Sequence, residues 1–321
     1  MKKKFLIVGD LHLDSKSPQS RLDNYMESCL MKLRETLQMA KEFQVDYYIL
    51  LGDIFDRIEV GGICRNKTLE ILLSDDGKPW NFEKYVVIGN HDIAHNESNL
   101  EKSALNTLIA AGAIKLSDSI EELGVRFLHF TPSLDENLRN GCLMDYSDKI
   151  YFCHASIMDQ PSRFDHVLFS DLKYPKSTKL IVSGHIHSPM EAVSSGGVKF
   201  FNPGCIGRSK IDETHSPQTL LIQYDFDTDM ISHKYFKLKK ALSSDIIFDI
   251  EKNNKRKIDN KNTQLFLEAI TNDEVNQSFA PKISSDLSAD LQVFGEETSS
   301  PKDVIEMAKK IINIVKTGGE L

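Results

Sequence analysis

Five short apolar runs in this chain each stop at side chains that can bind metal ions, and this pattern constrains the fold more than any other feature of the sequence. The runs are FLIVGD, YILLGD, YVVIGNHD, IYFCHA and LIVSGHIH. Ligand-binding residues collect at the carboxyl ends of strands in open α/β sheets. The pattern therefore predicts five strands that end around one cavity. The polar residues at these ends are Asp10, His12, Asp53, Asn90, His91, Asp92, His154, His185 and His187.

The spacing of the polar residues supports this interpretation. In an extended segment, side chains two residues apart point to the same side. We therefore expect Asp10 and His12 to face one cavity, and His185 and His187 to do the same. A single histidine after a strand is usually an ordinary loop residue, and GNHD alone could be a turn, because Asn and Asp favour turns. Neither explanation accounts for five such endings in one chain.

The residue types indicate which ligand the cavity would bind. Asp, His and Asn without Cys suit Mn, Fe or Zn better than Ca or a zinc site built from thiolates. The set is too large for one tetrahedral ion, but it is sufficient for two ions that share a carboxylate. Two divalent cations would leave the site positive after Asp10 and Asp53 are counted, and a positive site attracts phosphate oxygens. Two metals about 3.5–4 Å apart can activate a water and stabilise an in-line displacement, so no Ser or Cys nucleophile is needed.

Charge and cysteine content exclude some classes of protein. The net charge of -8 argues against a surface coated in positive charge for non-specific nucleic-acid binding. A local basic groove, bound metal ions or a basic partner could still supply positive charge. The five cysteines have no C-x-x-C spacing, which favours free thiols in a reducing compartment. The N-terminal apolar run is too short for a signal peptide or a membrane span, so we expect a cytoplasmic protein with no membrane segment.

The chain divides into regions of different character. Residues 1–240 alternate short apolar strands with polar or helical segments, which predicts a layered α/β domain. Within it, residues 25–43 and 98–112 have apolar side chains at helical spacing, and Gly112 would close the second helix. Residues 241–300 are polar with little periodicity, and they predict a linker or a small appendage.

Residues 301–321 predict a C-terminal amphipathic helix. Ser300 is a suitable N-cap, Pro301 fits the first helical position, and Gly318 would end the helix. The apolar stripe of this helix either packs on the chain's own domain or docks a partner protein, and the sequence leaves both open. The stripe consists of Val304, Ala308, Ile311, Ile312 and Val315.

Taken in order, the motifs D-x-H, G-D-x-x-D, G-N-H-D, a single H and G-H-x-H resemble the calcineurin-like metallophosphoesterase superfamily over residues 5 to about 205. The resemblance implies an α/β fold of four layers, in which two mixed β-sheets are flanked by helices and a small C-terminal appendage follows. It also implies two metal ions that share one carboxylate. The first ion would be bound by Asp10, His12, Asp53 and His187, and the second by Asp53, Asn90, His154 and His185.

The same resemblance implies roles for two residues beside the ligands. His91 would lie over the leaving oxygen as a proton donor or charge stabiliser. Asp92 would orient His91 through a histidine–carboxylate hydrogen bond. The two divalent ions would be manganese, with iron, zinc or magnesium as alternatives.

Two motifs narrow the resemblance. GDLHLD and GDIFDR are similar to the branch of DNA double-strand-break-repair nucleases that includes the SbcD-type exonuclease subunit and its phage relatives. This implies a DNA exonuclease or endonuclease subunit in recombination or repair, which works with a coiled-coil ATPase (SbcC-like) and can form a homodimer. The segment FFNPGCIGRSK resembles instead a loop of small phosphodiesterases. The alternative is therefore a phosphodiesterase or phosphatase acting on small nucleotides or phosphoproteins.

A DNA substrate would need cations near its backbone, because phosphate contacts require only Lys or Arg beside a groove. The alternative is that such side chains are solvated surface. No stripe of interleaved aromatic residues indicates a platform for single strands. The candidate cations are Arg208 and Lys210 after the N-P-G turn, and the cluster of Lys252, Lys255, Arg256 and Lys257.

Overall fold

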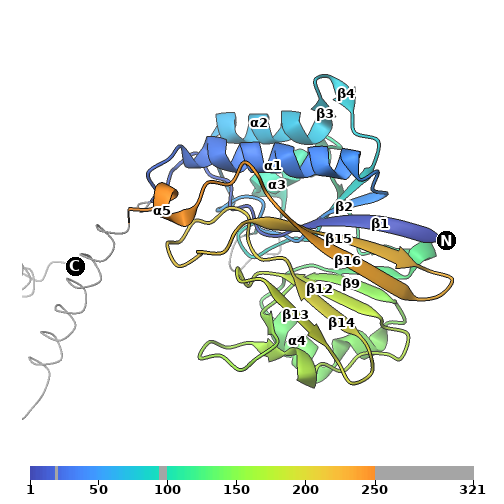
Figure 1. Cartoon of the computed structure of the whole chain (residues 1–321). Coiled ribbons are helices and arrows are strands. Elements are labelled where there is room, and N and C mark those ends of the chain that lie inside the picture. Colours follow the sequence, from blue (N-terminus) through green and yellow to red (C-terminus); the bar gives the residue numbers. More distant parts are fainter. Residues whose placement is uncertain (19–20, 94–99, 250–321) are drawn as a thin grey trace, which may run out of the picture. The chain divides into compact units, whose positions relative to one another are not determined.

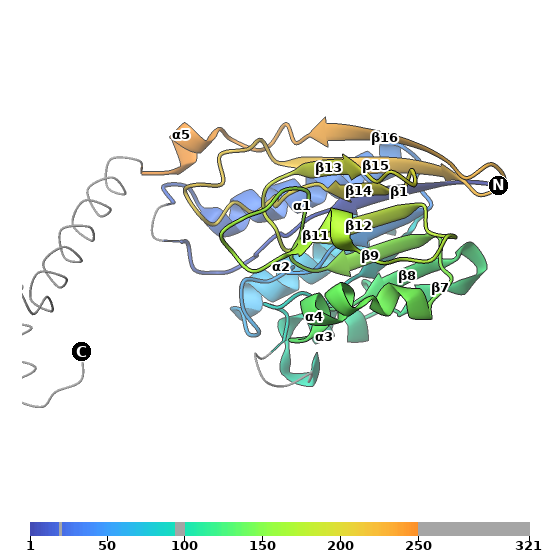
Figure 2. The same ribbon diagram turned by 90° about the horizontal axis from the view of Figure 1, so that it is seen from below.

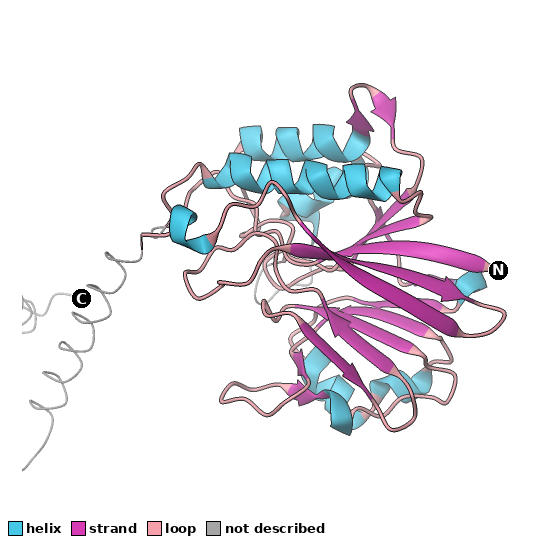
Figure 3. Ribbon diagram, viewed as in Figure 1, coloured by secondary structure: helices cyan, strands magenta, loops and turns pink. Residues whose placement is uncertain are grey.

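The computed structural model describes residues 1–18, 21–93 and 100–249, which form a layered α/β domain (Figure 1). Two six-stranded sheets pack face to face, and helices lie on their outer sides (Figure 3). The predicted linker beyond residue 249 and the predicted helix at 301–321 lie outside the described residues.

The first sheet has the strand order β16-β15-β1-β2-β5-β6. Strands β1, β2, β5 and β6 are parallel, whereas β15 and β16 are antiparallel to their neighbours. Because β1 pairs with β2 from Phe5–Tyr47 to Val8–Leu50, the carboxyl ends of these two strands are level. The bounds are β1 (Lys2–Val8), β2 (Tyr47–Leu50), β5 (Glu83–Val86), β6 (Lys115–Leu116), β15 (Gln218–Asp225) and β16 (Met230–Lys237).

The second sheet has the order β13-β14-β12-β9-β8-β7. Its four central strands are parallel, and β13 and β7 are antiparallel edges. Figure 2, seen from the side of this sheet, shows β12, β9 and β8 side by side. The bounds are β7 (Ser119–Ile120), β8 (Val125–Leu128), β9 (Ile150–His154), β12 (Leu180–Gly184), β13 (Met190–Val193) and β14 (Lys199–Asn202).

Helices flank both sheets, with α1, α2 and α3 beside the first and α4 beside the second (Figure 1). Among the helices of the described residues, none combines the length and hydrophobicity that crossing a bilayer requires. The α-helices are α1 (Tyr25–Glu42), α2 (Gly62–Leu73), α3 (Ala104–Ala110), α4 (Leu134–Asn140) and α5 (Ser244–Ile247). The 3-10 helices are η1 (Leu100–Lys102), η2 (Glu121–Leu123), η3 (Cys142–Asp145) and η4 (Phe169–Asp171). Two small ladders pair β3 (Ser74–Asp75) with β4 (Lys78–Pro79) and β10 (Ile157–Met158) with β11 (Val167–Leu168).

The apolar runs are buried on both faces because each sheet lies between two other layers. In β1, Phe5 and Ile7 pack into the core between the sheets. The alternate residues Leu6 and Val8 pack into the core beneath α1 and α2. Side chains alternate along a strand, so a continuous apolar run fits a strand covered on both sides. The predicted four-layer α/β sandwich is confirmed.

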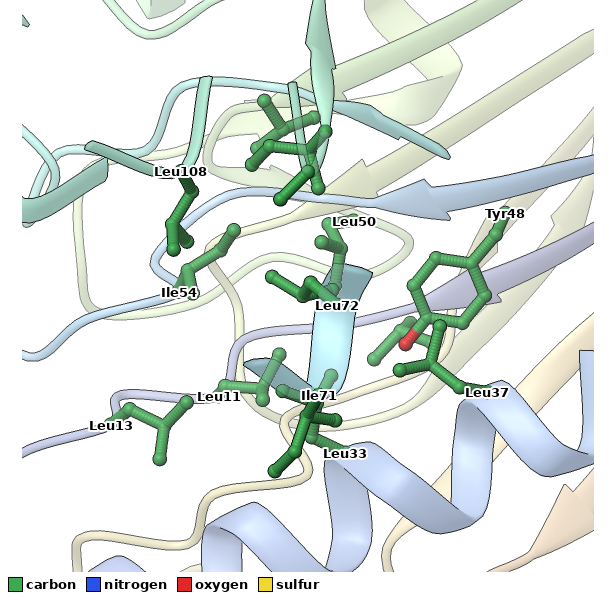
Figure 4. Packing of buried hydrophobic residues seen from close by; sticks show 14 of the residues in the cluster. Leu11, Leu13, Leu33, Leu37, Tyr48, Leu50, Ile54, Ile71, Leu72 and Leu108 are labelled. Carbon is green, nitrogen blue, oxygen red and sulfur yellow. The ribbon is translucent and has the colours of Figure 1, made fainter. Parts of the chain in front are cut away.

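The apolar core between the first sheet and helices α1 and α2 attaches these helices to the sheet. Leu33 and Leu37 of α1, with Leu72 of α2, face Tyr48 and Leu50 of β2 (Figure 4). A separate apolar core lies on the outer side of the second sheet, where Leu138 of α4 is fully buried. These cores hold the strand ends at fixed positions.

The structure refines the two predicted helices. Residues 25–43 form α1, whose N-cap Asn24 accepts a hydrogen bond from the Glu27 amide at 3.3 Å. The described part of the segment predicted at 98–112 is not one helix. It contains η1 and then α3, because the Ser103 side chain caps a new helix start by accepting from the Asn106 amide at 3.1 Å.

The domain continues past the expected boundary at residue 240. Ile247 and Phe248 are buried, and the Leu22 amide donates to the Ile247 carbonyl at 2.9 Å. The compact unit accordingly takes in residues 1–250. The first residues of the predicted linker are therefore part of the domain, since they cover the N-terminal end of α1.

Gly207 allows the loop after β14 to lie directly against the segment after β1, and this contact yields a testable prediction. A Cβ at Gly207 would lie 2.1 Å from the Leu11 carbonyl oxygen. We expect Gly207→Ala to lower the free energy of unfolding by about 1–3 kcal/mol, because it overpacks this contact. Gly62→Ala is the control, because nothing lies within 4 Å of a Cβ at Gly62. Urea denaturation measures both, and equal stabilities would contradict the predicted clash.

Candidate metal centre

The expected ligand residues meet at the carboxyl ends of both sheets. In the first sheet, β1, β2 and β5 lead to Asp10, Asp53 and Asn90. In the second, β9 ends at His154, and β12 leads to His185. The strand ends therefore converge as the sequence predicts. A cavity of about 480 Å³ is lined by His12, Asp53, Asn90, His91, His185 and His187, among others.

One group of donor atoms gathers around the end of β1. His12 Nε2 lies 3.0 Å from His187 Nε2 and 3.7 Å from Asp53 Oδ2. His187 Nε2 in turn lies 4.0 Å from Asp10 Oδ2. These four side chains place nitrogen and oxygen atoms around one small volume, as the ligands of one ion would.

A second group gathers on the other side of Asp53. Asn90 Oδ1 lies 2.8 Å from His185 Nδ1 and 3.0 Å from His154 Nε2. His154 Nε2 is 3.4 Å from Asp53 Oδ2. The same oxygen, Asp53 Oδ2, therefore borders both groups. This is the position that a bridging carboxylate requires.

The outer nitrogens of His154 and His12 face partners outside the two ligand groups. His154 Nδ1 donates to the Leu51 carbonyl at 2.7 Å, which directs Nε2 toward the second group. His12 Nδ1 lies 3.2 Å from Asp56 Oδ1, at ion-pair distance but without a hydrogen bond. Metal-binding histidines usually have their second nitrogen bonded as that of His154 is, because the bond fixes the tautomer and the ring orientation.

An unsatisfied carboxylate oxygen tests whether cations fit this site. Asp10 Oδ2 is buried and has no hydrogen-bond partner. A buried, unpaired carboxylate oxygen is costly unless a cation or a donor satisfies it. The surrounding Asp, Asn and His atoms form the donor set that divalent transition metals prefer. The residues therefore fit two divalent ions.

Burial and neighbouring charges shift the pKa values of several side chains in the site. Burial opposes ionisation of Asp53, but His154 and His12 hold the pKa of its carboxyl below the usual range. Burial, with the nearby charge of His154, lowers the pKa of His185 to about 4. Burial also raises the pKa of Asp92 to about 7, helped by the negative charge of Asp53.

Left-handed turns, and not extended spacing, bring the ligands together. We expected Asp10 and His12 to share a side because they are two residues apart in an extended segment. However, β1 ends at Val8, and His12 has a φ of 49°. Asp53 (φ 47°) and His185 (φ 76°) also have left-handed backbones. Such conformations cost roughly 1–3 kcal/mol each and persist only where the surrounding structure enforces them.

The expected hydrogen bond between His91 and Asp92 is absent. Asp92 Oδ2 accepts from the Asp53 and Gly89 amides, each at 2.9 Å, and Asp92 Oδ1 has no partner. His91 Nδ1 instead donates to the Asp56 carbonyl at 2.6 Å. Asp92 points into the backbone because the GNHD segment turns back over Asp53. A backbone oxygen therefore orients His91.

The two predicted phosphate contacts have different surroundings. Arg208 is only 2% exposed and donates to the Leu242 carbonyl, because residues 241–248 fold over it. It therefore presents no free guanidinium to the cavity. Lys210 does line the cavity. The basic cluster at 252–257 lies outside the described residues.

Sequence analysis missed two buried cations and one buried carboxylate. Arg21 donates to the Arg208 carbonyl at 2.7 Å, and Lys32 donates to the Ile206 and Gly207 carbonyls, so both hold the loop after β14. Lys32 could have been noticed, since it interrupts the apolar face of α1. Glu213 accepts a hydrogen bond from His187 Nδ1, and no motif marks it.

The charge of His154 predicts a pH dependence of metal binding. Burial disfavours its charged form, but Asp53 and Asp10 raise its pKa to about 10. At neutral pH a cation must displace this proton, so Mn²⁺ affinity should rise with pH, by up to about tenfold per unit. Calorimetric Mn²⁺ titration at several pH values below 10 measures the slope. In His154→Asn the slope should become shallower, whereas a pH-independent affinity of the wild type would contradict the prediction.

Comparisons with known proteins show the family to which the chain belongs. None of the curated proteins compared matches the chain. Solved structures similar to it include a dimetal phosphatase from Danio rerio (11% identity, TM-score 0.44, covering 73% of this chain and 98% of that chain). Vps29 complexed with zinc from Entamoeba histolytica is another (12%, 0.32, 73% and 98%). The sequence profile described as calcineurin-like phosphoesterase matches residues 3–234. The chain therefore belongs to the calcineurin-like phosphoesterase family.

Proposed function

We propose that this metal-dependent phosphoesterase cleaves phosphodiester bonds in DNA. The observation that carries two-metal phosphoester hydrolysis is the position of Asp53, whose Oδ2 lies 3.7 Å from His12 Nε2 in one ligand group and 3.4 Å from His154 Nε2 in the other. One carboxylate shared by two ligand groups suits a pair of divalent ions. Such a pair supplies water activation and charge stabilisation for displacement at phosphorus.

The ligand assignment follows the two groups of donor atoms. Asp53 is the shared ligand in this proposal. We assign manganese, with iron, zinc or magnesium as alternatives, since ligands that combine carboxylate, amide and imidazole suit divalent ions of this kind. The first ion would be held by Asp10, His12, Asp53 and His187, and the second by Asp53, Asn90, His154 and His185.

His91 is suited to protonate or stabilise the leaving oxygen. Its side chain is 39% exposed and lines the cavity. Its Nδ1 is bonded to the Asp56 carbonyl, which leaves Nε2 available to a substrate. Asp92 contributes indirectly, because it holds the backbone amides of Gly89 and Asp53.

Two features of the chain favour a DNA substrate. The motifs around Asp10 and Asp53 resemble those of the DNA-repair nuclease branch. The cavity also offers groups that suit a nucleotide, since Lys210 supplies a cation and Phe164, at 81% exposure, supplies an aromatic ring. Lysine contacts phosphate, and an aromatic ring can stack on a base.

The proposal includes a partner. A coiled-coil ATPase would bind the apolar stripe predicted at 301–321, and a nuclease that borrows DNA affinity from such a partner suits the net charge of -8. This pairing, a cytoplasmic location and a homodimer are inferred from the sequence alone. The stripe lies outside the described residues.

The second candidate is a phosphodiesterase or phosphatase acting on small nucleotides or phosphoproteins. It is favoured by the segment at 200–210, which resembles a loop of small phosphodiesterases. In the structure this loop packs against Asp10, one of the expected metal ligands. The Ile206 and Gly207 amides donate to the Asp10 carbonyl at 2.9 and 3.1 Å.

A substrate panel separates these functions. The metal-free chain would be tested with Mn²⁺ on end-labelled duplex DNA, single-stranded DNA, cyclic nucleotides and p-nitrophenyl phosphate. We expect DNA cleavage that excess EDTA abolishes and Mn²⁺ restores, and Asp53→Asn should lack this activity. Hydrolysis of the small substrates alone would support the second candidate. Activity that persists in excess EDTA after dialysis would exclude the two-metal mechanism.

His91 gives a separate test of the catalytic assignment. His91→Ala should lower kcat by about 10²–10⁴-fold, the usual contribution of a general acid, with metal content unchanged. Asp92→Ala is the contrasting variant. It should weaken metal binding and lower stability, because the Gly89 and Asp53 amides lose their acceptor. Metal analysis and steady-state kinetics measure both, and loss of one metal equivalent in His91→Ala would make His91 a ligand.

A further inference from the structure

A carboxylate outside every recognised motif contacts a histidine of the first ligand group. Glu213 lies beyond the loop after β14 and is 6% exposed. One of its oxygens, Oε1, accepts a hydrogen bond from His187 Nδ1. The other, Oε2, accepts from the Lys210 amide at 3.0 Å. Both oxygens of this buried carboxylate are therefore engaged.

The His187 ring connects Glu213 to the first ligand group. Its Nε2 atom, on the opposite side of the ring from Nδ1, lies 3.0 Å from His12 Nε2 and 4.0 Å from Asp10 Oδ2. A carboxylate bonded to Nδ1–H leaves the lone pair on Nε2 and prevents rotation of the ring. It also increases the basicity of the imidazole, which strengthens a bond from Nε2 to a cation.

In the second ligand group, no described carboxylate accepts a hydrogen bond from the outer nitrogen of a histidine, and the Asp10 Oδ1 atom lies 3.6 Å from His154 Nδ1. His154 Nδ1 donates to the neutral carbonyl of Leu51. His185 Nδ1 itself faces the group, 2.8 Å from Asn90 Oδ1. The charge of Glu213 is therefore applied to the first group and not to the second.

We propose that Glu213 is a positioning residue that sets the affinity of the first metal position by fixing the tautomer and orientation of His187. The inference rests on the two-metal site of the proposed function. It adds that the two positions differ in affinity because only in the first does a carboxylate accept a hydrogen bond from the outer nitrogen of a histidine. One carboxylate would then position both the His187 ring and the Lys210 backbone amide.

A direct role of Glu213 as a metal ligand is the competing explanation. Atoms of His187, Cys205 and Glu213 lie within 4.8 Å of one another and could in principle surround an ion. However, Glu213 Oε1 already occupies the Nδ1 side of His187, and Oε2 is bonded to the Lys210 amide. An ion there would have to break both hydrogen bonds. The geometry favours the positioning role.

Calorimetric Mn²⁺ titration of the full chain tests the proposal. His187→Ala and His154→Ala identify which binding step belongs to each group. In Glu213→Gln, which keeps an acceptor for Lys210 but loses the charge, first-step affinity should fall by about 10–100-fold. Second-step affinity should stay near the wild-type value. Glu191→Gln is the matched control, because Glu191 is a partly exposed glutamate whose carboxylate lies 3.2 Å from His233.

Glu213→Ala and Glu213→Asp complete the test. Glu213→Ala should weaken the first step at least as much as Glu213→Gln, and Glu213→Asp should recover part of the affinity because it restores the charge. Circular dichroism of metal-free Glu213→Gln should show that the variant folds, with a melting temperature below that of the wild type because one buried donor loses its acceptor. Unchanged affinities, equal weakening of both steps, or complete loss of one Mn²⁺ equivalent in Glu213→Gln would each overturn the positioning role.

This test is separate from that of the proposed function. A wild-type chain that binds two Mn²⁺ ions but cleaves no phosphoester would refute the proposed function, and the affinities would still report on Glu213. A wild-type chain that binds no Mn²⁺ would overturn both.

Discussion

The contacts of Asp53 are the interaction on which the rest of the site depends. Its carbonyl oxygen accepts from the Leu11 and His12 amides at 3.1 and 2.9 Å, which ties the turn after β2 to the turn after β1. Its amide donates to Asp92, and its Oδ1 accepts from the His91 amide at 2.9 Å. Only Oδ2 remains for the two ligand groups. Backbone hydrogen bonds thus fix a strained residue so that one oxygen faces both metal positions.

The strand endings could be predicted from the sequence, but the way they meet could not. Apolar runs on both faces of β1 and β2 require a layered sandwich, and parallel strands place Asp10 and Asp53 at the same edge. The side-chain directions depend on left-handed turns at His12 and Asp53, which local spacing does not encode. Asp10 and His12 therefore face one cavity as predicted, but left-handed turns and not extended spacing direct them there.

Residues whose roles depend on distant contacts were the ones that sequence analysis misjudged. Asp92 follows His91 directly, yet it bonds to backbone amides because the chain turns back over Asp53. Arg208 was a candidate phosphate contact, but it is buried and donates to the Leu242 carbonyl. Glu213 is 26 residues from His187, and no periodicity connects them. The helix expected at 98–112 was interrupted by Ser103, whose capping side chain competes with helix continuation.

The loop after β14 explains why two buried, positively charged side chains, Lys32 and Arg21, lie close to a site that would bind metal ions. Its backbone at 206–208 is not part of a strand, so its buried carbonyls need donors from elsewhere. Lys32 and Arg21 provide them from the side of α1, where the loop lies between these cations and the Asp10 backbone. Burying ammonium and guanidinium groups is costly unless they are hydrogen-bonded, and here they bond to oxygens that would otherwise be unsatisfied. The same loop leads to Lys210 and to Glu213, so a continuous set of hydrogen bonds connects Lys32 of α1 and Arg21 with the carboxylate that accepts from His187.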